Sequence, residues 1–375
     1  MAAVSFLTTF LLFYLPLLVV PVGYSYFEIP KVFVAEGLII LISVFFLLKG
    51  NLRPLLENKK LLYPVLGIFT LSIIDLIFFR TATTFFGNSF RLQGIFLLWN
   101  LLLFALVSSA LNIKRISPVF FLLPLVGLLI SIFLVGVDGR GQYVGTLGEA
   151  SALAATVAFI WPFAFLKLKQ KSLKWASLLL AAIIIFLSGQ RAGFVAFGIQ
   201  VAILVISVSL KQNLKMTVIF GLAVAVLSLT GPFFDPPGWY ENRAEIWKTA
   251  LTAPFDQIHD NKFSVVALLI GRGFGNVEQV LPKLSTGLDN NVRFQYVDSA
   301  HNVFLDWWIE GGILGVGLLS WLVFPALKRF TKKNDKVLIL SFMGVLVLLL
   351  FNPLSVVNLV QFWWLIGQGF SKDLS

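Results

Sequence analysis

His301 is the residue in this chain best suited to acid–base chemistry. It is one of two histidines among 375 residues, and it stands where a polar stretch meets a long apolar segment, about 301–325. A neutral imidazole can take a proton from a hydroxyl group near pH 7. His301 is therefore a candidate general base. The alternative is an interfacial histidine that only caps a helix.

Two acids follow His301 in the same segment. Asp306 and Glu310 are four residues apart, so they share one helix face, whereas His301 lies on another face. Neither acid is therefore expected to hold the imidazole from within this helix. The glycines in 311–315 would let the helix approach its neighbours closely, and we expect Glu310 to bond within the bundle.

Arg191 and Arg243 stand in settings that suit an anionic ligand. Arg191 follows Ser188-Gly189-Gln190 and opens an apolar segment, so a tight turn would place its guanidinium beside the free N–H groups of a helix start. Arg243 follows Asn242, a suitable N-cap for a short helix. A guanidinium fork matches phosphate geometry. The alternatives are an interfacial anchor for Arg191 and a salt-bridged surface helix for Arg243.

Several other chemistries are disfavoured. The chain has no cysteine, so it offers no thiol nucleophile and no thiolate metal site. His259 and His301 are too few and too far apart for a metal cluster, and we expect no metal and no cofactor. The glycine-rich stretch 271–275 does not open a helix after a strand, so it is not a dinucleotide site. No carboxylate pair stands out as that of a glycosidase.

The elements that must position these residues are membrane helices. The chain is 58% hydrophobic and 13% charged, with a mean hydropathy of +0.91. This composition predicts an all-α polytopic membrane protein with apolar segments long enough to span a bilayer. We expect about twelve spans, with soft boundaries: 5–22, 32–48, 61–79, 92–111, 117–136, 149–166, 173–188, 192–209, 215–231, 301–325, 336–351 and 354–370.

The chain divides into three parts on this interpretation. Residues 1–231 form the first nine spans, residues 232–300 form one long and partly helical loop, and residues 301–375 form the last three spans. The loop is rich in proline, aspartate, asparagine and charged residues. Because it directly precedes His301, it is expected to cover the site.

The basic residues predict the orientation of the chain. Alternate loops and the C-terminal stretch carry 15 lysines and three arginines with only three acids, which places both termini and these loops in the cytoplasm. The net charge of +11 therefore reflects topology, and no nucleic-acid partner is expected. The outer face carries four lysines and seven arginines, which favours a polyanionic ligand over salt bridges and lipid contacts alone. These arginines are Arg80, Arg91, Arg140, Arg191, Arg243, Arg272 and Arg293.

The order of these pieces resembles a known family. The matching residues span roughly 80–325, and their order, their common outer placement and the long loop before the histidine helix make the set specific. They are Arg91 with Gly94, Gly145-Thr146-Leu147-Gly148, Ser188 to Arg191 with Gly193, Asn242 to Trp247, Gly271 to Gly275, and Ala300-His301-Asn302 with Leu305, Glu310, Gly312 and Gly315. This set resembles the O-antigen ligase and O-antigen polymerase superfamily of bacterial inner-membrane proteins.

The resemblance implies a metal-independent, inverting glycosyltransferase with a GT-C-like fold and a periplasmic active site. The donor would be a glycan on undecaprenyl pyrophosphate, with Arg191 and Arg243 binding the pyrophosphate and His301 acting as the base. Supporting roles would fall to Arg80, Arg91, Arg140, Arg272 and Glu310. The chain departs from the family pattern at 149–151, where Glu-Ala-Ser replaces Asn-Pro-Asn, and at Gln190, where serine is common.

Two questions stay open from the sequence. The acceptor is expected to be lipid A–core, as in a ligase, with a second lipid-linked glycan (a polymerase) or a protein (an O-oligosaccharyltransferase) as alternatives. A lipid-linked glycan transporter or flippase is a rival from another class. That class predicts broken helices and polar residues at mid-depth, and the cytoplasmic halves of the predicted spans show few polar residues.

Overall fold

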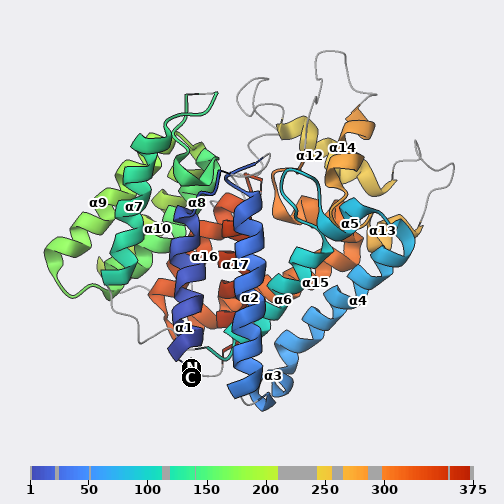
Figure 1. Cartoon of the computed structure of the whole chain (residues 1–375), viewed down its shortest axis with the longest axis horizontal. Coiled ribbons are helices and arrows are strands. Elements are labelled where there is room, and N and C mark those ends of the chain that lie inside the picture. Colours follow the sequence, from blue (N-terminus) through green and yellow to red (C-terminus); the bar gives the residue numbers. More distant parts are fainter. Residues whose placement is uncertain are drawn as a thin grey trace.

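The protein is all-α. The structure, a computed structural model, describes residues 2–21, 25–49, 52–111, 119–139, 141–209, 243–255, 265–285, 298–353 and 355–371. Most of these residues lie in helices, and no strand occurs among them (Figure 1). The helices are α1 (Ala2–Thr9), η1 (Phe10–Tyr14), η2 (Leu15–Leu17), α2 (Ile29–Lys49), α3 (Arg53–Glu57), α4 (Lys59–Phe79), α5 (Ala82–Phe86), α6 (Ile95–Ser108), α7 (Val119–Val135), η3 (Gly145–Leu147), α8 (Ala150–Lys167), α9 (Lys171–Ser188), α10 (Arg191–Ser209), α12 (Arg243–Thr252), η4 (Ala253–Phe255), α13 (Val265–Ile270), α14 (Val277–Ser285), α15 (Val303–Lys333), α16 (Lys336–Leu349) and α17 (Val356–Gly369).

Five of the described helices are long and apolar enough to cross a membrane. They cover Ile29–Leu48, Lys59–Phe79, Ala150–Lys167, Lys171–Ser188 and Val303–Lys333. Shorter apolar helices cover Ala3–Leu17, Ile95–Ser108, Phe120–Val135, Arg191–Ser207 and Lys336–Leu349. The predicted all-α class is confirmed, and the apolar helices agree with a membrane protein. The predicted span 215–231 lies outside the described residues.

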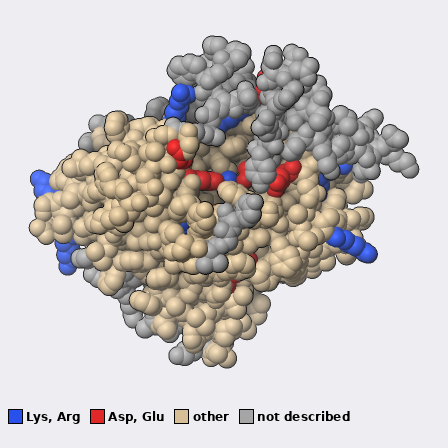
Figure 2. Space-filling model, turned by 45° about the horizontal axis from the view of Figure 1, so that its top comes forward, with Lys and Arg blue, Asp and Glu red and all other residues tan. Residues whose placement is uncertain are grey.

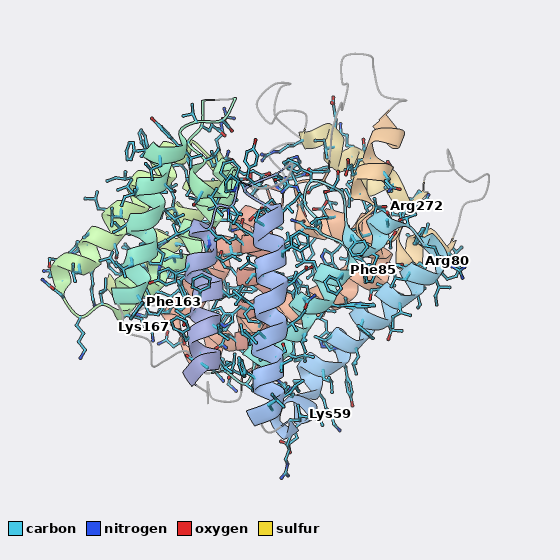
Figure 3. The ribbon with its side chains drawn as sticks, in the orientation of Figure 1. Lys59, Arg80, Phe85, Phe163, Lys167 and Arg272 are labelled. Carbon is cyan, nitrogen blue, oxygen red and sulfur yellow. The ribbon has the colours of Figure 1, made fainter. Side chains whose placement is uncertain are left out.

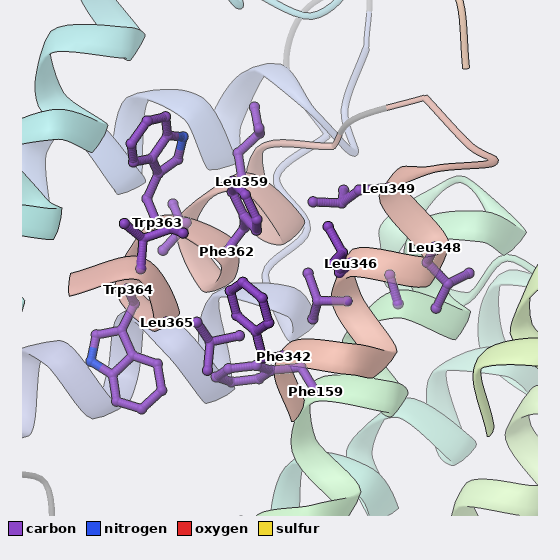
Figure 4. Close-up of a cluster of buried hydrophobic side chains, with 14 of the residues drawn as sticks. Phe159, Phe342, Leu346, Leu348, Leu349, Leu359, Phe362, Trp363, Trp364 and Leu365 are labelled. Atoms are coloured by element: carbon purple, nitrogen blue, oxygen red, sulfur yellow. The ribbon is translucent and has the colours of Figure 1, made fainter. Parts of the chain in front are cut away.

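The centre of the bundle is built from α8, α16 and α17 (Figure 1). Residues 337–349 of α16 and all of α17 are buried, as expected of helices that are apolar on every side. Figure 4 shows the aromatic and leucine side chains that fill this centre, with the Phe342 and Phe362 rings stacked at a centroid distance of 6.1 Å. This packed centre gives the surrounding helices a fixed surface to dock on.

Polar side chains tie the central helices together. The Gln200 amide of α10 donates to the carbonyl oxygens of Ala158 and Leu340, both at 2.7 Å, and accepts from Trp161 Nε1 at 2.8 Å. Gly344 leaves room for this amide, since a Cβ there would lie 2.2 Å from Gln200 Nε2. In an apolar interior such bonds hold helices in register. They link α10, α8 and α16.

Two arginines of the expected outer face lie far from Lys59, which belongs to the expected cytoplasmic face. Lys59 lies at the lower end of Figure 3, and Arg80 and Arg272 lie well above it. The end of α17 lies on the lysine side, because the Asn58 amide donates to the Phe370 carbonyl oxygen at 2.9 Å. The candidate site is therefore to be sought at the end that carries α5, α12 and α14.

The helix after His301 differs from the prediction in length and in continuity. The predicted segment 301–325 corresponds to α15, which begins at Val303 and runs to Lys333. It is broken at Gly312, whose φ of +59° and ψ of −155° are not helical. A residue without a Cβ adopts this conformation at low cost. The sequence had suggested only close packing for these glycines.

Candidate functional site

His301 lies in a strained turn directly before α15. Its φ is +56°, in the left-handed region that residues other than glycine rarely adopt. The next residue, Asn302, is the N-cap of α15, and its Oδ1 accepts hydrogen bonds from the backbone N–H groups of Phe304 and Leu305 at 3.0 and 3.2 Å. The start of α15 therefore fixes the backbone that follows His301.

Asp306 fixes the backbone that precedes His301. This buried carboxylate accepts hydrogen bonds from the Ala300 N–H at 2.6 Å and the Ser299 hydroxyl at 2.8 Å. Ser299 Oγ in turn accepts a hydrogen bond from the His301 N–H at 2.9 Å. Asp306 thus positions His301 through its backbone, which agrees with the prediction that neither acid of this helix holds the imidazole directly.

The first turn of α12 lies beside the same turn of the chain. Trp247 Nε1 donates to the Ala300 carbonyl oxygen at 2.9 Å, and its ring lies 6.2 Å from that of Phe351. Arg243 is the first residue of α12, four residues before Trp247, so both side chains leave the same helix face. The structure therefore brings Arg243 and His301 to one region.

Arg91 joins three loops behind this region. Its guanidinium forms an ion pair with Glu149 at 2.7 Å (Nη2 to Oε1) and a second with Asp298 through Nε and Oδ2. The Arg91 side chain is only 7% exposed, so both contacts are shielded from solvent. Arg91 thereby ties the loop before α6 to the loops before α8 and α15. Asp298 lies three residues before His301, so this network also anchors the strained turn.

The charges of this network perturb one another. Burial lowers the pKa of Arg91, but the carboxylates of Glu149, Asp298 and Glu28 outweigh burial, so its pKa lies above the ordinary value. Burial raises the pKa of Glu28 to about 7, against the lowering effect of Arg91. A Glu28 carboxyl oxygen also accepts a hydrogen bond from the Val356 N–H at the start of α17. Arg91 is therefore a permanently charged centre, whereas Glu28 can change its charge near neutral pH.

The glycine-rich stretch 271–275 is built into the break in α15. The Arg272 N–H donates to the Ile309 carbonyl oxygen at 2.7 Å, and the Gly273 N–H donates to the Glu310 carbonyl oxygen at 2.9 Å. A Cβ at Gly271 would lie 2.3 Å from the Glu310 carbonyl carbon, and one at Gly312 would lie 2.6 Å from a backbone oxygen. The break therefore requires glycine both in the helix, at Gly312, and in the loop packed against it, at Gly271.

Two buried acids hold this loop in place. Glu310 Oε1 accepts from the Gly275 N–H at 2.9 Å, so its partner lies in the predicted loop 232–300 and not in another helix of the bundle. Asp75 of α4 is fully buried, and its Oδ2 accepts from the Phe274 N–H at 3.3 Å. These bonds connect α4, α15 and the segment before α14.

A cavity of about 90 Å³ adjoins the His301 turn. Asp298 and Ser299 line it next to the turn, and Asp306 and Glu310 line it from α15. Its remaining walls come from the 88–94 segment, α6, the 274–278 segment and α17. Figure 2 shows a hollow on this face with acidic and basic side chains around it, on a described surface that is otherwise mostly uncharged.

Arg80, Arg191 and Arg272 do not line this cavity. The Ser188–Arg191 turn has the expected form, with Gly189 at φ +63° and Arg191 as the exposed first residue of α10, and Gln190 donates to the Gln142 side chain at 2.7 Å. Arg80 is exposed at the end of α4. Arg272 is half-buried and Arg140 lies outside the described residues, as do Asn242 and His259.

Sequence reasoning missed the partners of the predicted residues. Glu149 was noted only as part of a departure from a family pattern, and Asp298 was not singled out, yet both hold Arg91. Asp306 was considered only as a partner of the imidazole. The signal available was the polar stretch Asp298-Ser299, which places donors and acceptors directly before a helix start.

Comparison with known proteins places the whole chain beside a bacterial relative. A protein of Haemophilus influenzae is 24% identical to this chain over 350 residues, which cover 86% of the chain and 83% of the relative. That protein carries the name "Uncharacterized protein". No family model matches the chain.

Proposed function

We propose that this protein is a membrane glycosyltransferase that moves a glycan from undecaprenyl pyrophosphate to an acceptor hydroxyl. The observation that carries the proposal is the strained His301 turn, fixed by Asp306 and placed beside the first turn of α12, where Arg243 begins. Strained residues persist only where the surrounding structure holds them, and they concentrate at functional sites. A histidine and an arginine in one region of the polar end of the bundle suit the transfer of a glycan from a phosphate leaving group.

The chemistry assigned to the residues is simple. The acceptor oxygen forms a bond to the anomeric carbon as the bond from that carbon to the pyrophosphate oxygen breaks, which inverts the configuration. His301 takes the acceptor proton, a contribution of about 10²–10⁴ in rate for general bases. Arg243 and Arg191 stabilise the negative charge that grows on the lipid pyrophosphate. No covalent intermediate on the protein is required.

The cellular setting is part of the proposal. We assign the protein to the bacterial inner membrane with about twelve spans in a GT-C-like arrangement, both termini in the cytoplasm and the site in the periplasm. The separation of Lys59 from Arg80 and Arg272 supports one lysine-rich and one arginine-rich end. The acceptor proposed first is lipid A–core, with a second lipid-linked glycan or a protein as alternatives.

Reconstitution tests the proposal directly. The purified protein in liposomes is given undecaprenyl-pyrophosphate-linked glycan together with lipid A–core and a second lipid-linked glycan as competing acceptors. His301→Asn should lower transfer by about 10²–10⁴ and leave donor binding intact, because asparagine tolerates the left-handed conformation but is no base.

The arginine variants need a matched control. Arg243→Ala should weaken donor binding, and Arg243→Lys should restore it only in part. Arg53→Ala serves as the control, because Arg53 is an exposed arginine of α3 that pairs with Glu57 at 2.6 Å and does not line the cavity. Wild-type transfer by His301→Asn, or wild-type donor binding by Arg243→Ala, would contradict the assigned roles.

A transporter or flippase for lipid-linked glycans is the second candidate. The break in α15 at Gly312 favours it, because broken helices with buried acids are typical of transporters. Asp75 and Glu310 are such acids beside the break. Movement of lipid-linked glycan across the liposome membrane without an acceptor, and without any transferred product, would favour this candidate.

A further inference from the structure

The lining of the cavity beside His301 combines polar groups with aromatic rings. Four acids line it, Glu278, Asp298, Asp306 and Glu310, together with Asn88, Arg91, Gln93 and Ser299. Trp307, Trp363 and several leucines supply apolar surface, and the two tryptophan ring centroids are 6.1 Å apart. A ligand for this cavity must therefore offer both hydrogen-bond donors and an apolar face.

Its charge disfavours an anion. Arg91 is the one basic residue that lines the cavity, and its guanidinium is already paired with Glu149 and Asp298. The lining acids Glu278, Asp306 and Glu310 outnumber this one paired guanidinium. A pyrophosphate would meet like charges in a poorly solvated space, which costs several kcal/mol for a desolvated pair. The cavity therefore suits a neutral part of a substrate.

Two carboxylates have acceptor capacity left for such a ligand. Glu278 is half-buried at the start of α14 and makes no hydrogen bond or ion pair with any residue that the structure describes. Glu310 uses Oε1 for the Gly275 N–H, and within the described part of the chain Oε2 has no partner. Each ionised carboxylate accepts several O–H donors, and bonds to an ionised group are the strong ones.

We infer that this cavity binds one sugar ring of a substrate, with its hydroxyl groups toward Glu278 and Glu310 and its C–H face toward Trp307 and Trp363. Asp298 and Ser299 line the cavity three and two residues before His301, so a ring bound there lies near the turn that carries the proposed base. The inference rests on the proposed function for the reaction, whereas the binding of a neutral sugar can be measured without it.

Binding of neutral sugars to the full chain in detergent tests the inference. The probes are methyl glycosides of glucose, galactose, rhamnose and N-acetylglucosamine, measured by saturation-transfer NMR, with sodium pyrophosphate as the charged comparison. At least one glycoside should bind and pyrophosphate should not displace it. Glu278→Gln should weaken that binding by roughly tenfold, as expected for one charge-assisted hydrogen bond.

A second variant and a control keep the test independent of folding. Leu98→Phe adds volume at the cavity wall without changing charge, and it should abolish glycoside binding. Glu36→Gln is the control, because Glu36 is a buried acid of α2 that does not line the cavity. Binding of none of the four glycosides, or equal binding by wild type, Glu278→Gln and Leu98→Phe, overturns the inference.

The failure of this inference differs from the failure of the proposed function. In one outcome, transfer depends on His301, but Glu278→Gln and Leu98→Phe change neither glycoside binding nor the KM values for acceptor and donor. That outcome rejects the sugar site and leaves the proposed transferase activity supported. In the opposite outcome, glycosides bind as expected, no transfer occurs, and Arg243→Ala leaves pyrophosphate binding unchanged. That outcome supports the sugar site and rejects the proposed transferase activity.

Discussion

Asp306→Ala should release the His301 turn while leaving the bundle folded. The substitution removes the acceptor of two hydrogen bonds, at 2.6 Å from the Ala300 N–H and 2.8 Å from the Ser299 hydroxyl. Bonds to a charged acceptor are worth about 1.5–3 kcal/mol each, so the loss of two such bonds costs the turn about 3–6 kcal/mol. The left-handed His301 itself costs about 1 kcal/mol or more to hold. The strained conformation should therefore cease to be the dominant one.

Hydrogen exchange and transfer activity measure this loss separately. Amide exchange in residues 298–302 should become at least about 100-fold faster, which corresponds to about 3 kcal/mol of local stability. Transfer activity should fall by a similar factor, since the proposed base is no longer positioned. Asp306→Asn keeps one acceptor oxygen and should show an intermediate effect on both.

Asp335→Ala is the matched control for Asp306→Ala. Asp335 is the N-cap of α16 and accepts a hydrogen bond from the Leu338 N–H at 3.2 Å. Its loss should cost about 1 kcal/mol in α16 and leave exchange in 298–302 unchanged. Wild-type exchange of 298–302 in Asp306→Ala would refute the reasoning, because the two hydrogen bonds would then contribute nothing to the turn.

Three further outcomes follow from the same region, each measured by thermal unfolding in detergent. Gly312→Ala should destabilise the protein by about 2–4 kcal/mol, because a Cβ at φ +59° would lie 2.6 Å from a backbone oxygen; an unchanged Tm would mean that the break relaxes freely. Arg91→Leu should cost about 3–5 kcal/mol by leaving Glu149 and Asp298 unpaired, and a loss below about 1 kcal/mol would count against the buried network. Glu28 has a native pKa of about 7 against 4.5 when unfolded, so the native state binds the extra proton between these values and stability should fall as pH rises from 4.5 to 7. Glu28→Gln should remove that slope, and an identical pH dependence of the variant would show that another group causes it.

The helices of this protein could be predicted from sequence because their signal is local. Apolar runs of membrane length and the basic residues between them predict helices and their grouping. The Ser188–Arg191 turn was predictable for the same reason: a glycine between two apolar segments permits a tight reversal, and Gly189 indeed has a φ of +63°. In each case the residues that decide the structure are neighbours in the chain.

The internal contacts of the site could not be predicted, because their partners are distant in sequence. Arg91 meets Glu149 and Asp298 across 58 and 207 residues. A polar residue in a membrane protein usually needs a polar partner, but the residue type does not identify that partner. The role of Asp306 was missed for a subtler reason. Helical spacing was applied to the imidazole, whereas Asp306 reaches back to the backbone before the helix.

The break in α15 shows how such a distant contact bears on function. In a transporter, carbonyl groups freed by a broken helix coordinate the coupling ion. Here the carbonyl oxygens of Ile309 and Glu310 already accept hydrogen bonds from the N–H groups of Arg272 and Gly273, and the Glu310 side chain accepts from Gly275. A transported ion would have to displace the 271–275 loop from the helix. The break therefore serves better to seat this loop beside the cavity and the His301 turn, which is what a fixed catalytic site requires.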